Sequence, residues 1–434
     1  DLPEAVLVTA MAKHEKMFPV RDEAGKLTNQ FVFVRNSGED DTVRQGNEWV
    51  LNARFNDAKF FFDEDRKSTM ADFLEKTSTI VFQEKLGSVR TRADRLSRLA
   101  RSLAEQTGAN QMEQGLAEEA GRYAKADLAT GLVSELASLQ GVIGGVYARR
   151  EGMPSEVAWA LGSQYDLSKN EDPGSCSGER TAIRLIVADQ LDKLAGYLGL
   201  GLEPTGSSDP FGLRRAATIL IEAAWKWHGP LPGYDALFRE ALEGYRREGQ
   251  DLDEAGAERA LADLFASRYA SLMPEVRHDV LEGAMLREYP FELLMPRRVR
   301  LRAQMLTETA SDTGFVQAAT RPLNIVSAAR KKGVEYAFED PLAQTNADAL
   351  DSEEGRALLA LLKEQEDSLF RALRDEDGPA VVAAVRKLEQ PIHRFFESTM
   401  VMVDEPAVRY ARLSLLHACC LQLLHVGDFS KLEG

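Results

Sequence analysis

The chain contains 434 residues, of which 44% are hydrophobic and 28% charged, and its formal net charge is -16. These values exclude a disordered chain and predict a globular protein with two or three domains. No apolar run approaches the roughly 18 residues of a membrane span, and the first residues lack the layout of a signal peptide, so a cytoplasmic protein without membrane contact is expected. The three cysteines, Cys176, Cys419 and Cys420, provide neither a disulfide framework nor a spaced zinc set.

Strand-like segments are confined to residues 1 to about 65. There MFPV, a turn at DEAGK and the alternating QFVFVRN predict a β-hairpin. After FFFDEDRKS almost every segment repeats apolar residues at a spacing of three and four, which predicts α-helices. Gly/Pro/Ser-rich loops at NEDPGSCSGE, EPTGSSDP and WHGPLPG interrupt the helices, and domain boundaries are expected near residues 68, 208 and 290. The sequence therefore predicts a mainly α, multi-domain protein with a small β-containing N-terminal part.

The stretch PTGSSDPFGLRRAA, residues 204–217, places two adjacent arginines near the start of a predicted helix. Asp209 is a good N-cap and Pro210 suits the first helical position, so a helix from Pro210 to about Trp227 is expected. Arg214 and Arg215 cannot both lie on its buried stripe. They form either an exposed helix face or a contact with an anion.

Charge is sorted into blocks along the chain. Residues 85–101 contain six basic residues and one acid, and residues 287–302 contain five arginines and two glutamates. Residues 321–332 contain four basic residues and no acid, whereas the run 335–377 is acidic and is expected to lie away from any bound phosphate. Such sorting predicts one phosphate-facing side, with solvated helix faces as the alternative. The candidate RNA contacts of the last two basic blocks are Arg297, Arg298, Arg300, Arg302, Arg321, Arg330, Lys331 and Lys332.

Catalytic motifs are missing from the sequence. There is no Gly-rich phosphate loop of the Walker type, no GxSxG, no HExxH and no Cys/His cluster. The six histidines are scattered, and none occurs between residues 15 and 227. We therefore expect no catalytic residue in this chain.

Five long segments resemble, in order, the β subunit of the bacterial heterotetrameric (α2β2) glycyl-tRNA synthetase. They are GNEWVLNARFNDAKFFFDEDRK, IVFQEKLGSVRTRADR, KADLATGLVSELASLQGVIGGVYARREG, VADQLDKLAGYLGLGLEPTGSSDPFGLRRAA and FFESTMVMVDEPAVRYARLSLL. The resemblance implies a chain that lacks the N-terminal part of that subunit and grips tRNA(Gly), including its anticodon region. The partner α subunit would carry the active site and use ATP and Mg, so no cofactor is expected on this chain.

The same resemblance implies four domains: a remnant with the hairpin (1–68), an HD-like helical domain (69–208), a helical body (209–290) and an anticodon-binding bundle similar to that of arginyl-tRNA synthetases (291–434). Active HD hydrolases hold metal with His, His-Asp and Asp. Here the matching positions carry Gln83, Asp127 and either Asp189 or Asp192, without imidazole, so no bound metal is expected. These acids are expected to cap helices or to pair with Lys125 or Lys193.

Two departures from the family pattern stand out: Ser208 replaces a usual lysine, and Ala411 replaces an asparagine. Arg214 and Arg215 persist, and one of them is expected to bond RNA phosphate or an interdomain carboxylate. Two alternatives from other classes are a metal-dependent HD phosphohydrolase, which would need the missing histidines, and a degenerate HD helical scaffold. The scaffold would bind either protein alone or RNA without a ligase partner.

Overall fold

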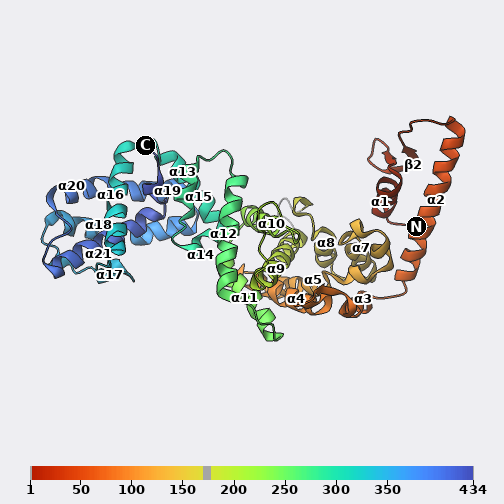
Figure 1. Ribbon diagram of the computed structural model, residues 1–434, viewed down its shortest axis with the longest axis horizontal. Helices are drawn as coiled ribbons and strands as arrows, with labels where there is room; N and C mark the ends of the chain where they lie inside the picture. The colour runs from red at the N-terminus through yellow and green to blue at the C-terminus, as the bar shows by residue number, and fades with distance from the viewer. Residues whose placement is uncertain (1, 170–176, 434) are drawn as a thin grey trace. The chain divides into compact units, whose positions relative to one another are not determined.

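The computed structural model describes residues 2–169 and 177–433, and within them helices predominate, with two small two-stranded sheets (Figure 1). The chain divides into an N-terminal unit, Asp1–Leu261, and a C-terminal unit, Ala262–Gly434, and the division falls inside α12 (Glu254–Leu272). The mainly α fold expected from the sequence is confirmed, while the finer division at residues 68, 208 and 290 stays a prediction. Cys176 lies outside the described residues.

The N-terminal unit begins with α1 (Glu4–Glu15), the hairpin β1 (Phe18–Arg21) and β2 (Leu27–Val32), and the long helix α2 (Asp40–Asp65). The two strands are antiparallel, with Phe18 opposite Val32, which confirms the predicted hairpin. Its turn is held by Asp22, whose Oδ1 accepts hydrogen bonds from the backbone nitrogens of Ala24 and Lys26. Alternate side chains of the hairpin pack with Met17 in a small core against α1 and α2.

The rest of this unit is helical except for the short hairpin β3 (Val81–Gln83) and β4 (Gly87–Ser88). Helix α4 packs on α5, α9 and α11, and α7 packs on α8. The helices are α3 (Met70–Lys76), α4 (Val89–Gln106), α5 (Gln111–Tyr123), α6 (Gly131–Glu135), α7 (Val142–Glu151), α8 (Ser155–Ser163), α9 (Ser177–Gly199), α10 (Leu213–Lys226) and α11 (Tyr234–Arg247).

Helix α10 begins later than the sequence suggests. Its first residue is Leu213. Gly212, directly before it, adopts a left-handed conformation (φ 64°), so Pro210 and Phe211 are not part of the helix. Asp209 nevertheless serves the helix start, since its carboxylate accepts hydrogen bonds from the backbone nitrogens of Leu213 and Arg214. The prediction is right about this acid and places the helix start three residues too early.

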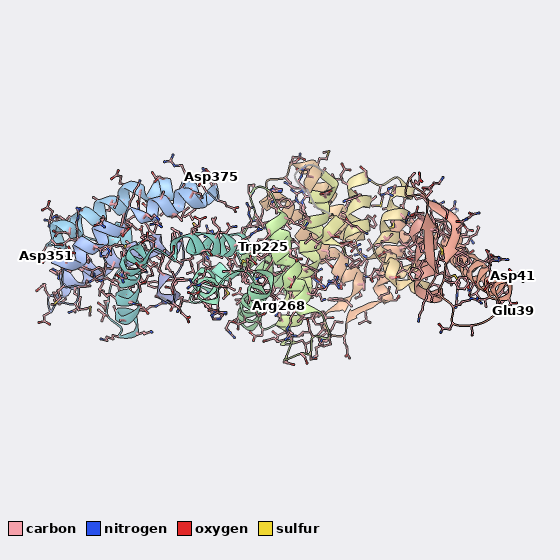
Figure 2. All side chains as sticks on the ribbon, turned by 90° about the horizontal axis from the view of Figure 1, so that it is seen from above. Glu39, Asp41, Trp225, Arg268, Asp351 and Asp375 are labelled. Carbon is pink, nitrogen blue, oxygen red and sulfur yellow. The ribbon has the colours of Figure 1, made fainter. Side chains whose placement is uncertain are left out.

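The C-terminal unit is a bundle in which α16 packs on α20, α21 and the short turn η6 (Phe429–Lys431). Phe315 and Phe429 meet edge to face in its core, with ring centroids 5.3 Å apart. Figure 2 labels Asp351 and Asp375, which flank the two ends of α18. The helices are α13 (His278–Met285), α14 (Pro290–Leu293), α15 (Pro296–Thr309), α16 (Thr313–Lys331), α17 (Pro341–Gln344), α18 (Glu353–Arg374), α19 (Gly378–Arg386), α20 (Glu389–Ser398) and α21 (Pro406–Leu424).

None of the helices described here has both the length and the apolar character needed to cross a lipid bilayer.

Candidate nucleic-acid interface

In the first basic block, residues 85–101, the two central arginines point inward instead of forming a phosphate-facing surface. The block lies mostly on α4, and both Arg92 and Arg95 are buried. The Nε atoms of these arginines lie 3.0 and 2.7 Å from the carboxylate of Asp192, and Arg95 also contacts Glu248. Because a buried guanidinium must be paired, α4 uses these charges to pack against α9 and the end of α11. The expectation that this block faces RNA is wrong for its two central arginines.

The exposed or half-buried arginines of the same block have acidic neighbours as well. Arg90 pairs with Glu75 and Asp94, and Arg101 pairs with Glu118. At α4, basic residues that are grouped in the sequence therefore lie beside acidic residues in the structure.

Lys125 contacts Asp189, at one of the positions that match the HD ligand set. Its ammonium is buried, 3.1 Å from Asp189 Oδ1, and donates hydrogen bonds to Gln164 Oε1 at 2.9 Å and Tyr165 Oη at 2.8 Å. Arg92 Nη2 lies 3.0 Å from the same Asp189 oxygen. Burial alone would raise the pKa of Asp189, but these two cations hold it below its usual value. The expected pairing of Asp189 with Lys125 is confirmed.

These contacts and those of Asp192 leave two of the acids, Asp189 and Asp192, committed to protein cations. In the described part of the chain, no three His, Cys, Asp or Glu side chains are arranged to hold a metal ion. The side chain of Gln83 is engaged locally, since its Oε1 accepts a hydrogen bond from the backbone nitrogen of Lys85 at 2.6 Å. The donor set does not fit a resident metal, because Asp189 and Asp192 are already paired with Lys125, Arg92 and Arg95.

Asp127 caps the start of α7 from a buried position, as predicted for these acids. Its Oδ2 accepts hydrogen bonds from the backbone nitrogens of Gly141 at 2.5 Å and Gly144 at 3.3 Å, while its Oδ1 has no hydrogen-bond partner among the described residues. Burial raises the pKa of Asp127 to about 6, although the two backbone donors and Lys125 oppose that rise. An acid in this setting is easily protonated.

The two arginines of α10 have different settings. The guanidinium of Arg214 donates to the backbone carbonyls of Gly206 at 2.7 Å and Ser208 at 3.4 Å, so it braces the loop that precedes the helix. These acceptors are backbone carbonyls and not the interdomain carboxylate that was one expectation. Arg215 is exposed. Of the pair, Arg215 presents its charge to solvent.

Helix α15 forms as predicted, but its arginines are not equivalent. Arg302 is 3% exposed, pairs with Glu292 and donates to the carbonyl of Ala284 at 3.2 Å. The placement of Arg302 on an RNA-facing surface is therefore wrong, because its face of α15 packs toward α13 and α14. Arg298 and Arg300 are exposed.

Arg297 connects α15 to the acidic run. It is half-buried and lies 2.6 Å from Glu376, so this acid does not lie apart from the basic block as expected. The two charges offset one another, which weakens α15 as a phosphate surface.

Helix α16 keeps its charge on the surface. Its sequence, TGFVQAATRPLNIVSAARK, contains no acidic residue. Gln317, Arg321, Asn324, Ala328 and Lys331 are all exposed, and their spacing places them along one face. This exposed face of α16 is called the α16 stripe below. It combines two cations with two amides and one small apolar residue, Ala328, and contains no acid.

Aromatic rings flank the cations of this helix. The guanidinium of Arg321 lies 4.5 Å from the ring centroid of Phe396, and that of Arg330 lies 5.3 Å from that of Phe338. Phe338 is 54% exposed. Lys332 is exposed directly after the helix. Phe396 is half-buried. Accessible rings beside guanidinium groups are a surface on which single-stranded nucleic acid can stack.

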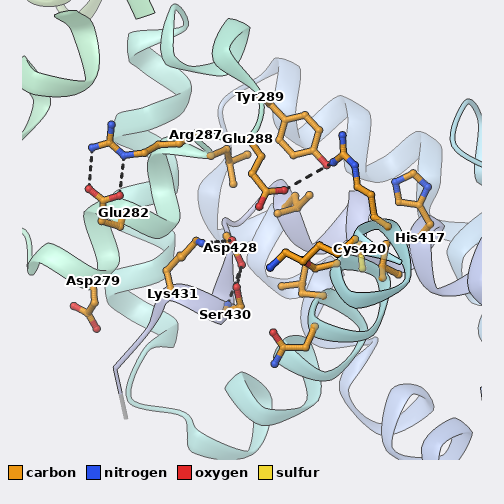
Figure 3. Close-up of a pocket in the computed structure, with 18 of the residues that line it drawn as sticks. Asp279, Glu282, Arg287, Glu288, Tyr289, His417, Cys420, Asp428, Ser430 and Lys431 are labelled. Atoms are coloured by element: carbon orange, nitrogen blue, oxygen red, sulfur yellow. Dashed lines mark hydrogen bonds and ion pairs between the residues drawn. The ribbon is translucent and has the colours of Figure 1, made fainter. Parts of the chain in front are cut away.

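A cavity of about 460 Å³ opens beside α16, between α13, α21 and the turn η6 (Figure 3). Asn324, Ser327, Arg330 and Lys331 enter it from α16, and two tyrosines, Tyr289 and Tyr336, also line it. Sequence reasoning found Arg330 and Lys331 but missed the tyrosines. The signal in the sequence was their position, since Tyr289 lies within the basic block 287–302 and Tyr336 follows the block 321–332.

Several ion pairs lie in the cavity lining, among them Arg287–Glu282, Arg330–Glu288 and Lys431–Asp428. Arg287 holds Glu282 with two hydrogen bonds, of 2.8 and 2.9 Å, so both groups are fully engaged. Arg330 Nη1 lies 3.9 Å from Glu288 Oε2, beyond hydrogen-bond distance, and both side chains are at least half exposed. The Arg287–Glu282 pair is therefore tight, whereas Arg330–Glu288 and Lys431–Asp428, each at 3.9 Å, are loose (Figure 3).

Comparisons with known proteins cover both units. A family model described as glycyl-tRNA synthetase beta subunit matches residues 1–286, and one described as DALR anticodon binding domain matches residues 316–428. The glycine–tRNA ligase beta subunit of Desulfitobacterium hafniense is 35% identical over 446 residues, covering 99% of this chain and 61% of the relative. Those of Cereibacter sphaeroides and Phenylobacterium zucineum are 34% and 35% identical, each covering 100% of this chain and 62% of the relative. The chain thus spans less than two thirds of these relatives.

Proposed function

Because this chain belongs to the glycyl-tRNA synthetase β-subunit family, we propose that its C-terminal unit binds the anticodon region of tRNA(Gly). The segment that matches an anticodon-binding domain, residues 316–428, contains most of α16 and all of α18 to α21. Residues 297–302 lie outside this match.

The observation that carries the proposal is the α16 stripe. A chain of net charge -16 has to separate acids from any surface that meets phosphate, since affinity for nucleic acid depends on cations that neutralise phosphates. Helix α16 contains no acid among its 19 residues, and Glu288 approaches it at Arg330, near its C-terminal end. Arg321, Lys331 and Lys332 would contact phosphates, and the rings of Phe338 and Phe396 would stack with unpaired bases.

We assign the chemistry of the ligase to a partner subunit. We propose that the α subunit forms the glycyl-adenylate with ATP and Mg, and that the present chain binds no cofactor and contributes the grip on tRNA. The buried pairs around Lys125 support this, because the residues at the HD positions are used to hold helices together. They disfavour the phosphohydrolase alternative. A cytoplasmic location stays a prediction.

The test is a binding titration of the full chain with an RNA hairpin that carries the anticodon stem and loop of tRNA(Gly). Reversing two charges of the α16 stripe, Arg321→Glu with Lys331→Glu, should lower affinity at least tenfold. It should also reduce the slope of log affinity against log salt by roughly 0.7 to 0.9 for each phosphate that is no longer neutralised.

The matched control reverses two exposed cations of α18, Lys363→Glu with Arg371→Glu, and so changes net charge equally. It should leave affinity within about threefold, since only long-range attraction is altered. Equal losses of affinity in both double variants would mean that α16 does not bind the phosphates.

A further inference from the structure

The cavity beside α16 contains a loose ion pair at a position where a base could reach it. We infer that this cavity takes one unpaired cytosine, whose hydrogen-bonding edge is read by Glu288 and Arg330. The inference rests on the proposed binding of tRNA(Gly), and it assigns selectivity to residues outside the α16 stripe.

The size and lining of the cavity suit a nucleotide. Its volume of about 460 Å³ lies in the range of roughly 300 to 1,000 Å³ typical of small-ligand sites. Tyr289 and Tyr336 supply aromatic surface, and Lys331 belongs both to the cavity lining and to the α16 stripe. A strand that follows the stripe would therefore pass the mouth of the cavity, where one base can turn inward.

The pair itself can be opened. At 3.9 Å, Arg330 and Glu288 attract one another without a direct hydrogen bond, and their side chains are 50% and 61% exposed. Solvent screening makes such a pair weak. A base that satisfies both groups replaces a loose contact with hydrogen bonds to two charged partners, which are the stronger kind.

The polarity of the pair selects the base. The carboxylate of Glu288 can only accept hydrogen bonds and the guanidinium of Arg330 can only donate them. Cytosine offers a 4-amino donor next to the acceptors N3 and O2, and acidic side chains accept from that amine. Uracil carries a carbonyl oxygen in place of the amine, which would face the carboxylate.

Guanine also presents donors beside an acceptor and could satisfy the same two side chains. The sequence of the bound RNA therefore decides between guanine and cytosine. Glycine codons begin with two guanines, and their anticodons therefore carry two adjacent cytosines. The tight pair between Arg287 and Glu282 is not a competing reader, because both oxygens of Glu282 already accept hydrogen bonds from Arg287. Asp428, which faces Lys431 at 3.9 Å, is held instead by the backbone nitrogen and hydroxyl of Ser430.

The experiment measures binding of the full chain to three anticodon hairpins. They carry cytosine, uracil or guanine at one of the two anticodon cytosines, and the series is then repeated at the other cytosine. At one position the unaltered chain should prefer cytosine to uracil at least tenfold. Glu288→Ala should reduce that preference to less than threefold, mainly through weaker binding of the cytosine hairpin. The control, Glu335→Ala, removes an exposed acid that does not line the cavity and should keep the preference.

Each outcome bears on the inference. Salt-dependent binding without a preference for cytosine at either position, or a preference that survives in Glu288→Ala, overturns the cavity assignment and leaves the α16 proposal standing. Preference for guanine would show the same pair reading a different base and would also overturn it. Failure of the unaltered chain to bind any hairpin would overturn the proposed function together with this inference.

Discussion

Lys125 Nζ lies 3.1 Å from Asp189 Oδ1 inside the N-terminal unit, with Gln164 and Tyr165 completing its oxygen contacts. This ammonium therefore pairs with one of the acids at the positions that match the HD ligand set. Burial lowers the pKa of Lys125, while Asp189 favours its charged form. The pair is therefore a structural ion pair that depends on both partners.

Replacing Lys125 by Met should destabilise the chain strongly, because the change leaves Asp189 buried with one cation fewer. The expected loss is about 3 to 5 kcal/mol in the free energy of unfolding, measured by urea denaturation. Lys85→Met changes an exposed lysine and should cost less than about 0.5 kcal/mol. A loss below about 1 kcal/mol in the Lys125 variant would contradict this account of the cluster.

Asp127→Asn should stabilise the chain at neutral pH. The carboxyl has an unfolded pKa near 3.8 and a folded pKa of about 6, so folding favours its protonated form and the ionised form costs stability above pH 6. A shift of that size corresponds to about 3 kcal/mol. The stability difference between the variant and the unaltered chain should be largest near pH 7.5 and should vanish as pH falls from 6 to below 4. A difference that is independent of pH would be evidence against the raised pKa.

Arg302→Met should destabilise the chain more than Arg298→Met, although the two residues lie one turn apart on α15. Arg302 is buried against Glu292 and the carbonyl of Ala284, so its loss should cost about 3 kcal/mol. Arg298 is exposed and lies 3.4 Å from Glu292, so its loss should cost less than about 1 kcal/mol. Thermal unfolding of both variants checks the order, and equal costs would show that burial of Arg302 does not matter.

Two glycines of α5 provide a matched pair. A Cβ at Gly121 would lie 2.5 Å from the carbonyl oxygen of Leu96 on α4, whereas a Cβ at Gly115 meets no atom within 4 Å. Gly121→Ala should therefore separate the helices and cost about 1 to 3 kcal/mol. Gly115→Ala should stabilise by about 0.5 to 1 kcal/mol, because alanine loses less backbone entropy in a helix. Denaturation midpoints of the two variants should shift in opposite directions.

The sequence by itself determined the mainly helical fold, the first hairpin and the family. Helices and hairpins follow from local spacing of apolar residues and from turn residues, which are close together in the chain. Asp209 could likewise be recognised as the acid that serves the start of α10, since a cap acts within about one turn of its own residue.

Only the tertiary structure decided which charges are available to a partner. Arg92 and Arg321 look alike in the sequence, each within a basic block. One is buried on Asp189 and Asp192, about a hundred residues further along the chain, and the other lies exposed beside Phe396. A helix turns successive residues to different sides, so the neighbours of a charge are set by packing between helices and not by its block in the sequence.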